Sequence, residues 1–418
     1  MRIAQVAPLY ERVPPLYYGG TERVVSYLTE ALVEQGHQVT LFASGDSLTK
    51  AKLISPCTQS LRLNPDRGDD LAYNLLHLEH VFQRAHLFDI IHFHIDYFHY
   101  PFSRREKVPH VTTLHGRLDM ADLVPLYREF DDMPVVSISN SQRAPLPWIR
   151  WCGTVYHGLP LDLYKPKKEP GQYLLFLGRI SPEKRPDRAI EIAKRAGMPL
   201  KIAAKVDEKD RRYMENEIRP LLDDPLVEFL GEVGDSGKAE LLRNAYALLF
   251  PIDWAEPFGL VMIEAMACGT PTIAFRGGSV REIITDGLTG YVVESVEQAT
   301  QALKRLHAFD RMRCRSTFEE RFSAHRMAQD YVQIYQKLIH TDARAVRRHG
   351  VHARLSQIAA VEPRPKMNGK TLERPDQIAS RSLISIGDRS QAAGELGNGQ
   401  HRRRSDAATD DECARNPE

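Results

Sequence analysis

The sequence has no closely spaced cysteines and no long run of apolar residues. Its five cysteines are scattered and show no Cys-x-x-Cys spacing, so we expect reduced thiols and neither disulfides nor a zinc site. No apolar stretch reaches the length of a transmembrane helix, and the opening residues MRIAQVAP lack the pattern of a signal peptide. These absences predict a cytoplasmic protein with no transmembrane segment.

A strong excess of charge is also absent. The formal net charge is +1, with 27% charged and 42% hydrophobic residues, which gives no reason to expect nucleic acid as a partner. The length of 418 residues exceeds what one hydrophobic core usually supports, so we expect at least two domains.

Short apolar runs alternate with amphipathic helical stretches over most of the chain. Helices are expected at 21–35 and 70–86. Strands are expected at 3–7, 37–43, 89–94, 111–115 and 135–139, and again at 173–178, 200–204, 227–230, 247–252, 271–275 and 290–293. The alternation predicts an α/β fold with two Rossmann-like, doubly wound sheets.

The last part of the chain has a different character. Residues 326–339 have a helical pattern, whereas residues 341–418 contain no Phe, Tyr or Trp. We expect this tail to be disordered, because it has too little apolar surface to offset chain entropy. The segment at 145–151, PLPWIRW, could contact a membrane surface or pack beneath a hinge, which would make the protein peripheral at a membrane or leave it in the cytoplasm.

One stretch, Asp253–Gly269, combines a buried helix with acidic residues. Pro257 suits the first position of a helix, and Gly269 suits its end. The helix is apolar on every side except at Glu264, and a buried carboxylate needs hydrogen-bonding partners. The start of such a helix binds anions through its free N–H groups, although a core helix with one ion-paired glutamate fits the pattern equally well.

The spacing of Glu256 and Glu264, with seven residues between them, and the EPFG opening resemble the signature of family 4 glycosyltransferases of the GT-B fold. The resemblance covers about residues 1–340. It implies two facing Rossmann-like domains with the active site in the cleft between them. The implied parts are an acceptor-side domain at 1–164, a nucleotide-sugar domain at 165–325 and a helix at 326–340 that crosses back to the first domain.

The resemblance also implies roles for several residues. Glu264 would bind the ribose hydroxyls of the donor, and Glu256 would lie near the transferred sugar. Val233, at the end of a strand, would line the site of the nucleobase. The backbone N–H groups that would meet the donor diphosphate are those of Phe258, Gly259 and Leu260.

Two further segments fit a diphosphate site. Arg179 ends a predicted strand and Lys184 lies in the following loop, where paired cations can bind phosphoryl oxygens; the alternative is two solvated surface charges. Gly19 and Gly20 precede a helix and would let a phosphate approach the backbone, although they could form only a tight turn. The resembled family binds donor phosphates at both segments.

Histidines follow two of the predicted strands. His94 and Asp96, near the carboxyl end of one strand, are candidates for the acceptor side. His92 shares a face with them, which invites a metal interpretation, but the resembled enzymes are metal-independent. His115 ends the next strand, and the matching T-x-H-G segment of the family lies beside the donor sugar. The resemblance therefore makes His115 and Glu256 the catalytic candidates, and we expect no metal and no cofactor.

The resemblance implies a retaining enzyme that moves a hexosyl group from a nucleotide-diphosphate sugar to an acceptor hydroxyl. No Asp-x-Asp triplet occurs to hold a divalent ion. The stretch APLYERVPPLYYGGTE resembles a bacterial branch that contains pterin glucosyltransferases, which favours UDP-glucose and a pterin, with polysaccharide and lipid-linked acceptors still open. A catalytically idle nucleotide-sugar sensor is the main alternative. A nicotinamide-dependent dehydrogenase is a weaker one, because no G-x-G-x-x-G occurs.

Overall fold

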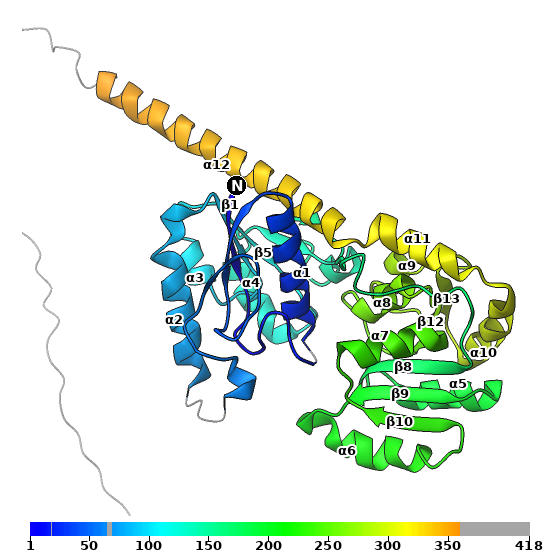
Figure 1. Ribbon diagram of the computed structural model, residues 1–418. Coiled ribbons are helices and arrows are strands. Elements are labelled where there is room, and N and C mark those ends of the chain that lie inside the picture. Colours follow the sequence, from blue (N-terminus) through cyan, green and yellow to red (C-terminus); the bar gives the residue numbers. More distant parts are fainter. Residues whose placement is uncertain (18, 65–68, 360–418) are drawn as a thin grey trace, which may run out of the picture. The chain divides into compact units, whose positions relative to one another are not determined.

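The computed structural model describes residues 1–17, 19–64 and 69–359, with side chains described through residue 341. Two parallel sheets lie within one compact unit, Met1–Ile358 (Figure 1). The predicted boundary at residue 164 falls between the last strand of the first sheet and the first strand of the second. The prediction of two doubly wound Rossmann-like sheets is confirmed.

The first sheet has seven parallel strands in the order β3-β2-β1-β4-β5-β6-β7. Two of them, β3 and β7, were not predicted, because β3 is a three-residue edge strand and the four-residue β7 contains Gly153, which has low strand propensity. The strands are β1 (Arg2–Val6), β2 (Gln38–Phe42), β3 (Lys52–Ile54), β4 (Ile90–Phe93), β5 (His110–Thr113), β6 (Val135–Ser137) and β7 (Trp151–Thr154).

The second sheet has six parallel strands in the order β10-β9-β8-β11-β12-β13. In both sheets the order reverses beside the first strand, and ligands of such sheets bind at the carboxyl ends of the strands near this reversal. The strands are β8 (Tyr173–Arg179), β9 (Leu200–Lys205), β10 (Val227–Gly231), β11 (Ala245–Phe250), β12 (Thr272–Phe275) and β13 (Gly290–Val293).

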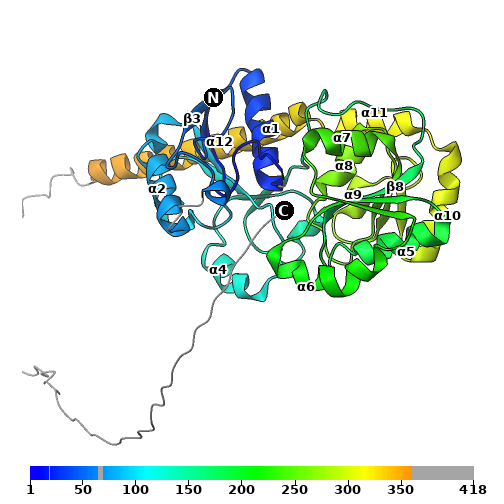
Figure 2. The same ribbon diagram turned by 60° about the horizontal axis from the view of Figure 1, so that its bottom comes forward.

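Helices cover both faces of the second sheet (Figure 2). Alternate residues of β8 explain this layering, since Leu174 and Phe176 pack with α5 and α10, whereas Leu175 packs on the face that carries α7 and α8. The helices of this half are α5 (Pro186–Ala196), α6 (Arg211–Tyr213), α7 (Asp235–Asn244), α8 (Leu260–Ala267), α9 (Val280–Ile283), α10 (Val296–Arg305) and α11 (Arg311–Arg321).

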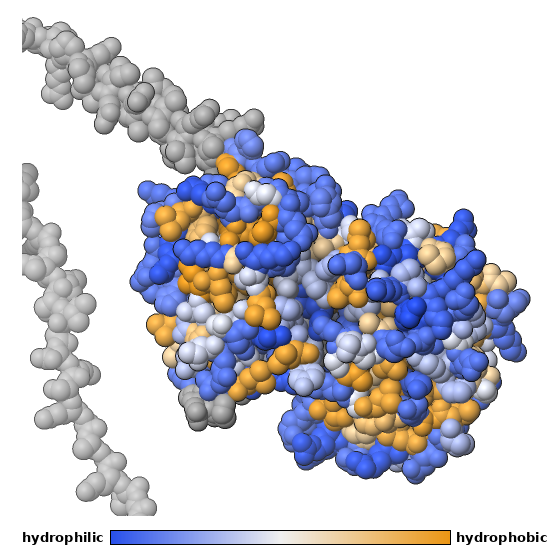
Figure 3. Space-filling model, viewed as in Figure 1, coloured by the Kyte–Doolittle hydropathy of each residue, from blue (hydrophilic) through white to orange (hydrophobic). Residues whose placement is uncertain are grey.

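The helices of the first half are α1 (Gly20–Glu34), α2 (Asp70–Phe82), α3 (Tyr100–Ser103) and α4 (Val124–Glu129). Between 145 and 151, Trp151 donates its indole N–H to the Leu146 carbonyl over 2.9 Å, whereas Trp148 is 39% exposed. The surface in Figure 3 is largely hydrophilic, with several hydrophobic areas. Among the described residues, no helix is both long enough and apolar enough to cross a membrane.

The last helix, α12, begins at Ala324 and ends at Ala359, and it returns to the first sheet (Figure 1). The sequence predicted an end near residue 340 and a disordered tail from 341. The helix continues because residues 341–359 are rich in Ala and Arg, which have high intrinsic helix propensity. The predicted disorder of residues 360–418 lies outside the described residues.

Candidate active site

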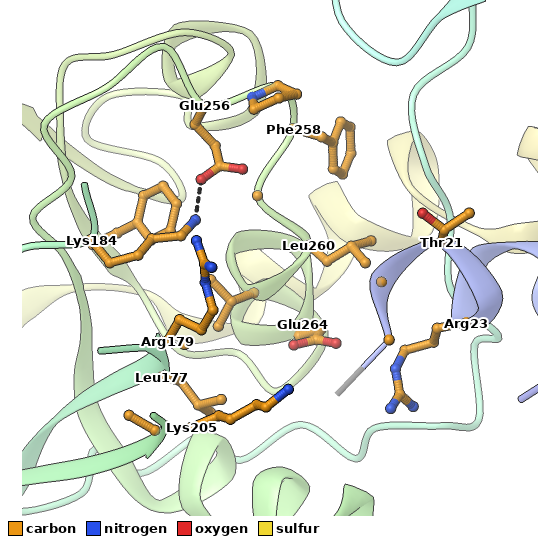
Figure 4. A pocket seen from close by; sticks show the side chains of 18 of the residues that line it. Thr21, Arg23, Leu177, Arg179, Lys184, Lys205, Glu256, Phe258, Leu260 and Glu264 are labelled. Carbon is orange, nitrogen blue, oxygen red and sulfur yellow. Dashed lines mark hydrogen bonds and ion pairs between the residues drawn. The ribbon is translucent and has the colours of Figure 1, made fainter. Parts of the chain in front are cut away.

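A cavity of about 540 Å3 is lined by loops from both sheets (Figure 4). Its walls include the start of α1, the loop after β5, the ends of β8 and β9, and the start of α8. Every predicted site residue lines it except His94 and Asp96. Those that do are Gly19, Gly20, His115, Arg179, Lys184, Val233, Glu256, Phe258, Gly259, Leu260 and Glu264.

The start of α8 differs from the prediction. Pro257 lies outside the helix, which begins at Leu260, because Gly259 is in the left-handed conformation with φ +79°. A Cβ at Gly259 would lie 2.7 Å from Met262 Cε, so only glycine fits without strain. The first N–H groups of a helix have no intrahelical partner. Those of Leu260 and Val261 are therefore the helical donors at the cavity, and Phe258 precedes them in the loop.

Glu256 and Lys184 form an ion pair on one side of the cavity, with the lysine Nζ on the glutamate Oε2 (Figure 4). The Trp254 indole N–H also donates to this carboxylate over 3.1 Å. Lys184 Nζ lies over the rings of Trp254 and Phe250, 5.0 and 5.5 Å from their centroids. An anionic ligand would therefore compete with Glu256 for Lys184.

Arg179 lies among carboxylates that the motif did not reveal. Its Nη1 lies 3.1 Å from Asp207 and 3.6 Å from Asp210. Lys205 pairs with Asp207 over 2.9 Å and lines the same cavity. The sequence analysis missed Lys205, although it ends a strand that pairs in parallel with the strand of Arg179, with the two residues in register. Lys205 could have been identified from the sequence, because it and Arg179 are cations at the ends of two adjacent parallel strands.

Glu264 has the hydrogen-bonding partner that a buried carboxylate requires. The Lys238 ammonium, from α7, donates to Glu264 Oε1 over 2.7 Å. Both side chains are buried, with 11% of the lysine and 5% of the glutamate exposed. Arg23, from α1, lies on the opposite side of the cavity and pairs with Asp235 over 2.6 Å. Neither Lys238 nor Arg23 was predicted, because neither belongs to a motif and each is recognisable only from its three-dimensional neighbours.

His115 lines the cavity, as predicted, but His94 lies behind it. The His94 side chain is 2% exposed, and its Nδ1 lies 2.9 Å from His115 Nε2. The acceptor-side candidate His94 therefore does not line the cavity, because the alternation along a strand gives the face of a residue but not its depth. Burial lowers the pKa of His115 to about 3, so its imidazole is neutral near pH 7.

Asp96 is the other predicted residue that does not line the cavity. Its backbone is left-handed, with φ +49°, and its side chain is accessible to solvent. Surrounding protein nevertheless removes part of its hydration and raises the carboxyl pKa to about 6, an effect opposed by the backbone N–H of His115. Within the described part of the chain, no group of three or more His, Cys, Asp or Glu side chains is arranged to hold a metal ion.

Two family models match the chain. Residues 18–160 match Glycosyltransferase Family 4, and residues 164–315 match Glycosyl transferases group 1. The two matches meet between the sheets: the first includes every strand of the first sheet except β1, and the second includes the whole second sheet.

Curated relatives match over part or most of the chain. An N-acetyl-alpha-D-glucosaminyl L-malate synthase of Bacillus anthracis is 37% identical over 124 residues, which are 28% of this chain and 32% of the relative, so the match spans about a third of that protein. A glycogen synthase of Mycobacterium tuberculosis is 26% identical over 79% of this chain and 94% of its own length.

The fold is similar to that of solved structures. One of them is Anabaena HepE in complex with UDP and glucose, which superposes with a TM-score of 0.62. The match covers 81% of this chain and all of the other, at 17% identity.

Proposed function

Because the chain belongs to the family 4 glycosyltransferases of the GT-B fold, we propose that it transfers a glycosyl group from a nucleotide-diphosphate sugar to an acceptor hydroxyl. One observation carries the proposal: Arg179, Lys184 and the start of α8 meet in one cavity. Paired cations and a helix N-terminus together favour a diphosphate. They also stabilise the charge that develops on a diphosphate leaving group.

The diphosphate would replace carboxylates that now pair with the cations. Lys184 contacts Glu256, and Arg179 contacts Asp207. Phosphoryl oxygens at the start of α8 would draw Lys184 toward them and leave the Glu256 carboxylate to face the sugar. Binding of the donor and placement of Glu256 are thereby coupled through one lysine.

The remaining residues receive roles along the donor. Glu264, held by Lys238, accepts hydrogen bonds from the ribose hydroxyls, and Val233 lines the place of the nucleobase. His115 contacts the sugar. We propose transfer with retention. The bond from the anomeric carbon to the phosphate oxygen breaks, the bond to the acceptor oxygen forms on the same face, and the acceptor proton moves to the departing phosphate.

We further propose UDP-glucose as the donor. The resemblance of the stretch at residues 7–22 to pterin glucosyltransferases supports it, and so does the fold similarity to HepE, whose structure contains UDP and glucose. The acceptor hydroxyl belongs to a pterin, a polysaccharide or a lipid-linked sugar. Activity measured with each acceptor class separates these three, and hydrolysis or transfer of the sugar separates an enzyme from an idle sensor.

Metal independence is part of the proposal, since Arg179, Lys184 and the α8 dipole supply the positive charge that a divalent ion would otherwise provide. The expected result is unchanged turnover after the purified enzyme is treated with a chelator. A loss of activity that Mg2+ or Mn2+ restores would contradict this part and leave the rest intact.

The direct test of the diphosphate site is calorimetry with UDP and UDP-glucose. Arg179→Ala and Lys184→Ala should each weaken binding, because a hydrogen bond to a charged group contributes about 1.5–3 kcal/mol. Lys194→Ala is the matched control, since Lys194 pairs with Asp224 away from the cavity. Unchanged affinity in both cavity variants would contradict the proposed site.

A further inference from the structure

A row of buried side chains connects α12 to His115. Gln5 Nε2 donates to the Tyr335 hydroxyl over 3.1 Å, and Gln5 Oε1 lies 2.8 Å from His94 Nε2. His94 Nδ1 in turn lies 2.9 Å from His115 Nε2. Gln5 and Tyr335 are fully buried and His94 is 2% exposed. We call Tyr335, Gln5, His94 and His115 the positioning chain.

The direction of each hydrogen bond in the positioning chain follows from Gln5. An amide oxygen only accepts and an amide nitrogen only donates. Because Gln5 Oε1 faces His94, His94 Nε2 carries the proton. A neutral imidazole has one N–H, so His94 Nδ1 must accept, and His115 Nε2–H is the donor to it. The lone pair of His115 is then on Nδ1.

A second row of hydrogen bonds starts at Tyr335 and passes through His92 to Thr113, and its directions also follow from Gln5. Since Tyr335 accepts from Gln5, its own O–H is free to donate to His92 Nδ1, over 2.7 Å. The Nε2–H of a neutral His92 then donates to Thr113 Oγ1, also over 2.7 Å. Burial lowers the pKa of both His92 and His94 well below the ordinary value, so both rings are neutral. The assigned directions are therefore consistent, because no hydrogen atom in either row has to be shared between two hydrogen bonds.

Stacking holds the plane of the His115 ring, in addition to the hydrogen bond that holds its Nε2. The His157 ring stacks on it, with centroids 5.4 Å apart and an angle of 16° between the planes. Phe258 packs against His157, with centroids 4.6 Å apart. Within the described part of the chain, no residue hydrogen-bonds His115 Nδ1, so this is the nitrogen left for a ligand in the cavity.

We propose that Gln5 and His94 are positioning residues that hold His115 in the Nε2–H tautomer, so that Nδ1 accepts a hydrogen bond from a hydroxyl of the transferred sugar. Only the identity of the ligand rests on the proposed function; the tautomer does not. A site that presents only an acceptor selects a hydroxyl and rejects a group that can only accept, such as a carbonyl or a fluorine. It also prevents His115 from acting as an acid through Nδ1.

The test is nitrogen NMR of the full chain with 15N-labelled histidine, in which the tautomer of each ring is read directly. His115→Gln identifies the His115 signals. We expect the Nε2–H tautomer in the ligand-free wild type and a mixture of tautomers in His94→Leu and Gln5→Leu. The Nδ1–H tautomer in the wild type would overturn the proposal, whether or not the variants fold.

His99→Leu is the matched control. His99, which directly precedes α3 in the first domain, is also fully buried, but it bonds Ser103 and Thr112 instead of the positioning chain. It should lower the melting temperature about as much as His94→Leu and leave the His115 tautomer unchanged. If His99→Leu alters the tautomer to the same extent, the effect is general loosening of the core and the proposal is wrong.

Kinetics supply a second readout. His94→Leu should lower kcat/KM about tenfold, the effect of losing one hydrogen bond. His94→Asn should recover part of it, because Asn Oδ1 can accept from His115. In the double variant, His94→Leu should not lower kcat/KM below the value of His115→Leu alone. A further tenfold loss of kcat/KM would overturn the proposal. If His115 has the Nε2–H tautomer but the protein transfers no sugar, the result supports the role of the positioning chain and contradicts the proposed function.

Discussion

At the scale of single residues, the two glutamates of the α8 segment differ in their partners. Glu256 pairs with Lys184, a cation that a diphosphate would bind, whereas Glu264 pairs with the buried Lys238. Under the proposed function, donor binding would release the Glu256 carboxylate from Lys184, whereas the Glu264 carboxylate would stay paired with Lys238. This difference separates their expected effects on catalysis.

Glu256→Gln should lower kcat more than it raises KM, because it removes negative charge where positive charge develops on the sugar. Glu264→Gln should mainly raise KM, by roughly tenfold for about 1.4 kcal/mol, since it weakens ribose contacts present in the ground state as well. Donor titrations at saturating acceptor measure both. Glu240→Gln, at an exposed position on α7, is the control, and wild-type constants in both test variants would refute the assigned roles.

Glu22, in the first turn of α1, is buried, with 6% exposure. Burial raises the pKa of its carboxyl to about 7, and the charge of Glu11 adds to the shift. The folded protein therefore holds a proton that the unfolded chain releases near pH 4.5. It follows that this residue makes the free energy of unfolding fall as the pH rises from about 4.5 to 7.

The prediction is that Glu22→Gln removes this slope. Relative to wild type, the variant should gain stability between pH 4.5 and 7, by at most about 3 kcal/mol for a pKa shift of this size. Urea unfolding at several pH values measures the difference. Glu79→Gln, an exposed glutamate on α2, should leave the pH dependence unchanged, and parallel curves for wild type and Glu22→Gln would refute the prediction.

Much of the candidate site could be predicted from the sequence, because its residues belong to short motifs at strand ends and helix starts. The glycine pair, Arg179, Lys184 and the two glutamates all line the cavity. Their partners could not be predicted. Lys238 and Asp207 come from other elements, and pairing with them depends on how helices and strands pack. The depth of His94 likewise depends on the residues that cover the end of β4.

At the scale of elements, the start of α8 depends on one backbone conformation. Pro257 is a good first residue of a helix, and the sequence therefore predicted a start there. The left-handed Gly259 places the start three residues later. The residues from Glu256 to Gly259 therefore form a loop, and Glu256 in that loop pairs with Lys184.

Gly259→Ala should therefore destabilise the protein by about 1–2 kcal/mol from its positive φ alone, and it should weaken UDP binding by displacing the first N–H groups of α8. The added Cβ would also lie 3.1 Å from the Phe250 ring. Urea unfolding and calorimetry measure the two effects.

Gly237→Ala is the matched control for this variant. Gly237 lies inside α7, and the nearest atom to an added Cβ is 3.6 Å away, an ordinary contact. Alanine there should stabilise the helix by roughly 0.5–1 kcal/mol and leave UDP affinity unchanged. Equal stability and equal affinity of Gly259→Ala and wild type would mean that the backbone at 259 does not position α8.

At the scale of the whole molecule, polar contacts join the two domains both at the cavity and away from it. Arg23 of the first domain pairs with Asp235 of the second. Glu282 of α9 accepts hydrogen bonds from the backbone N–H groups of Asn140 and Ser141, each over 2.7 Å. Such contacts were beyond sequence reasoning, because they depend on how the two domains meet.

The first half of the helix α12 packs apolar side chains on the core. Its buried side chains include Met327, Tyr331, Ile334 and Tyr335, and the partly buried ones end at Ile339. Tyr335 also anchors Gln5 of the positioning chain. Among the side chains that the structure describes, Ile339 is the last apolar one that packs on the core.

A chain ending at residue 345 should accordingly melt at the wild-type temperature and keep full transferase activity. The contrasting variant is a chain ending at residue 330, which loses Tyr331, Ile334 and Tyr335 and so uncovers buried apolar surface; large buried side chains removed in this way cost about 3–5 kcal/mol each. We expect it to be unfolded or inactive, as circular dichroism and donor calorimetry would show. A drop of several degrees in the melting temperature of the 345-residue chain would mean that the segment after residue 345 packs on the core. In that case, a chain ending at Ala359 distinguishes the rest of α12 from the residues beyond it.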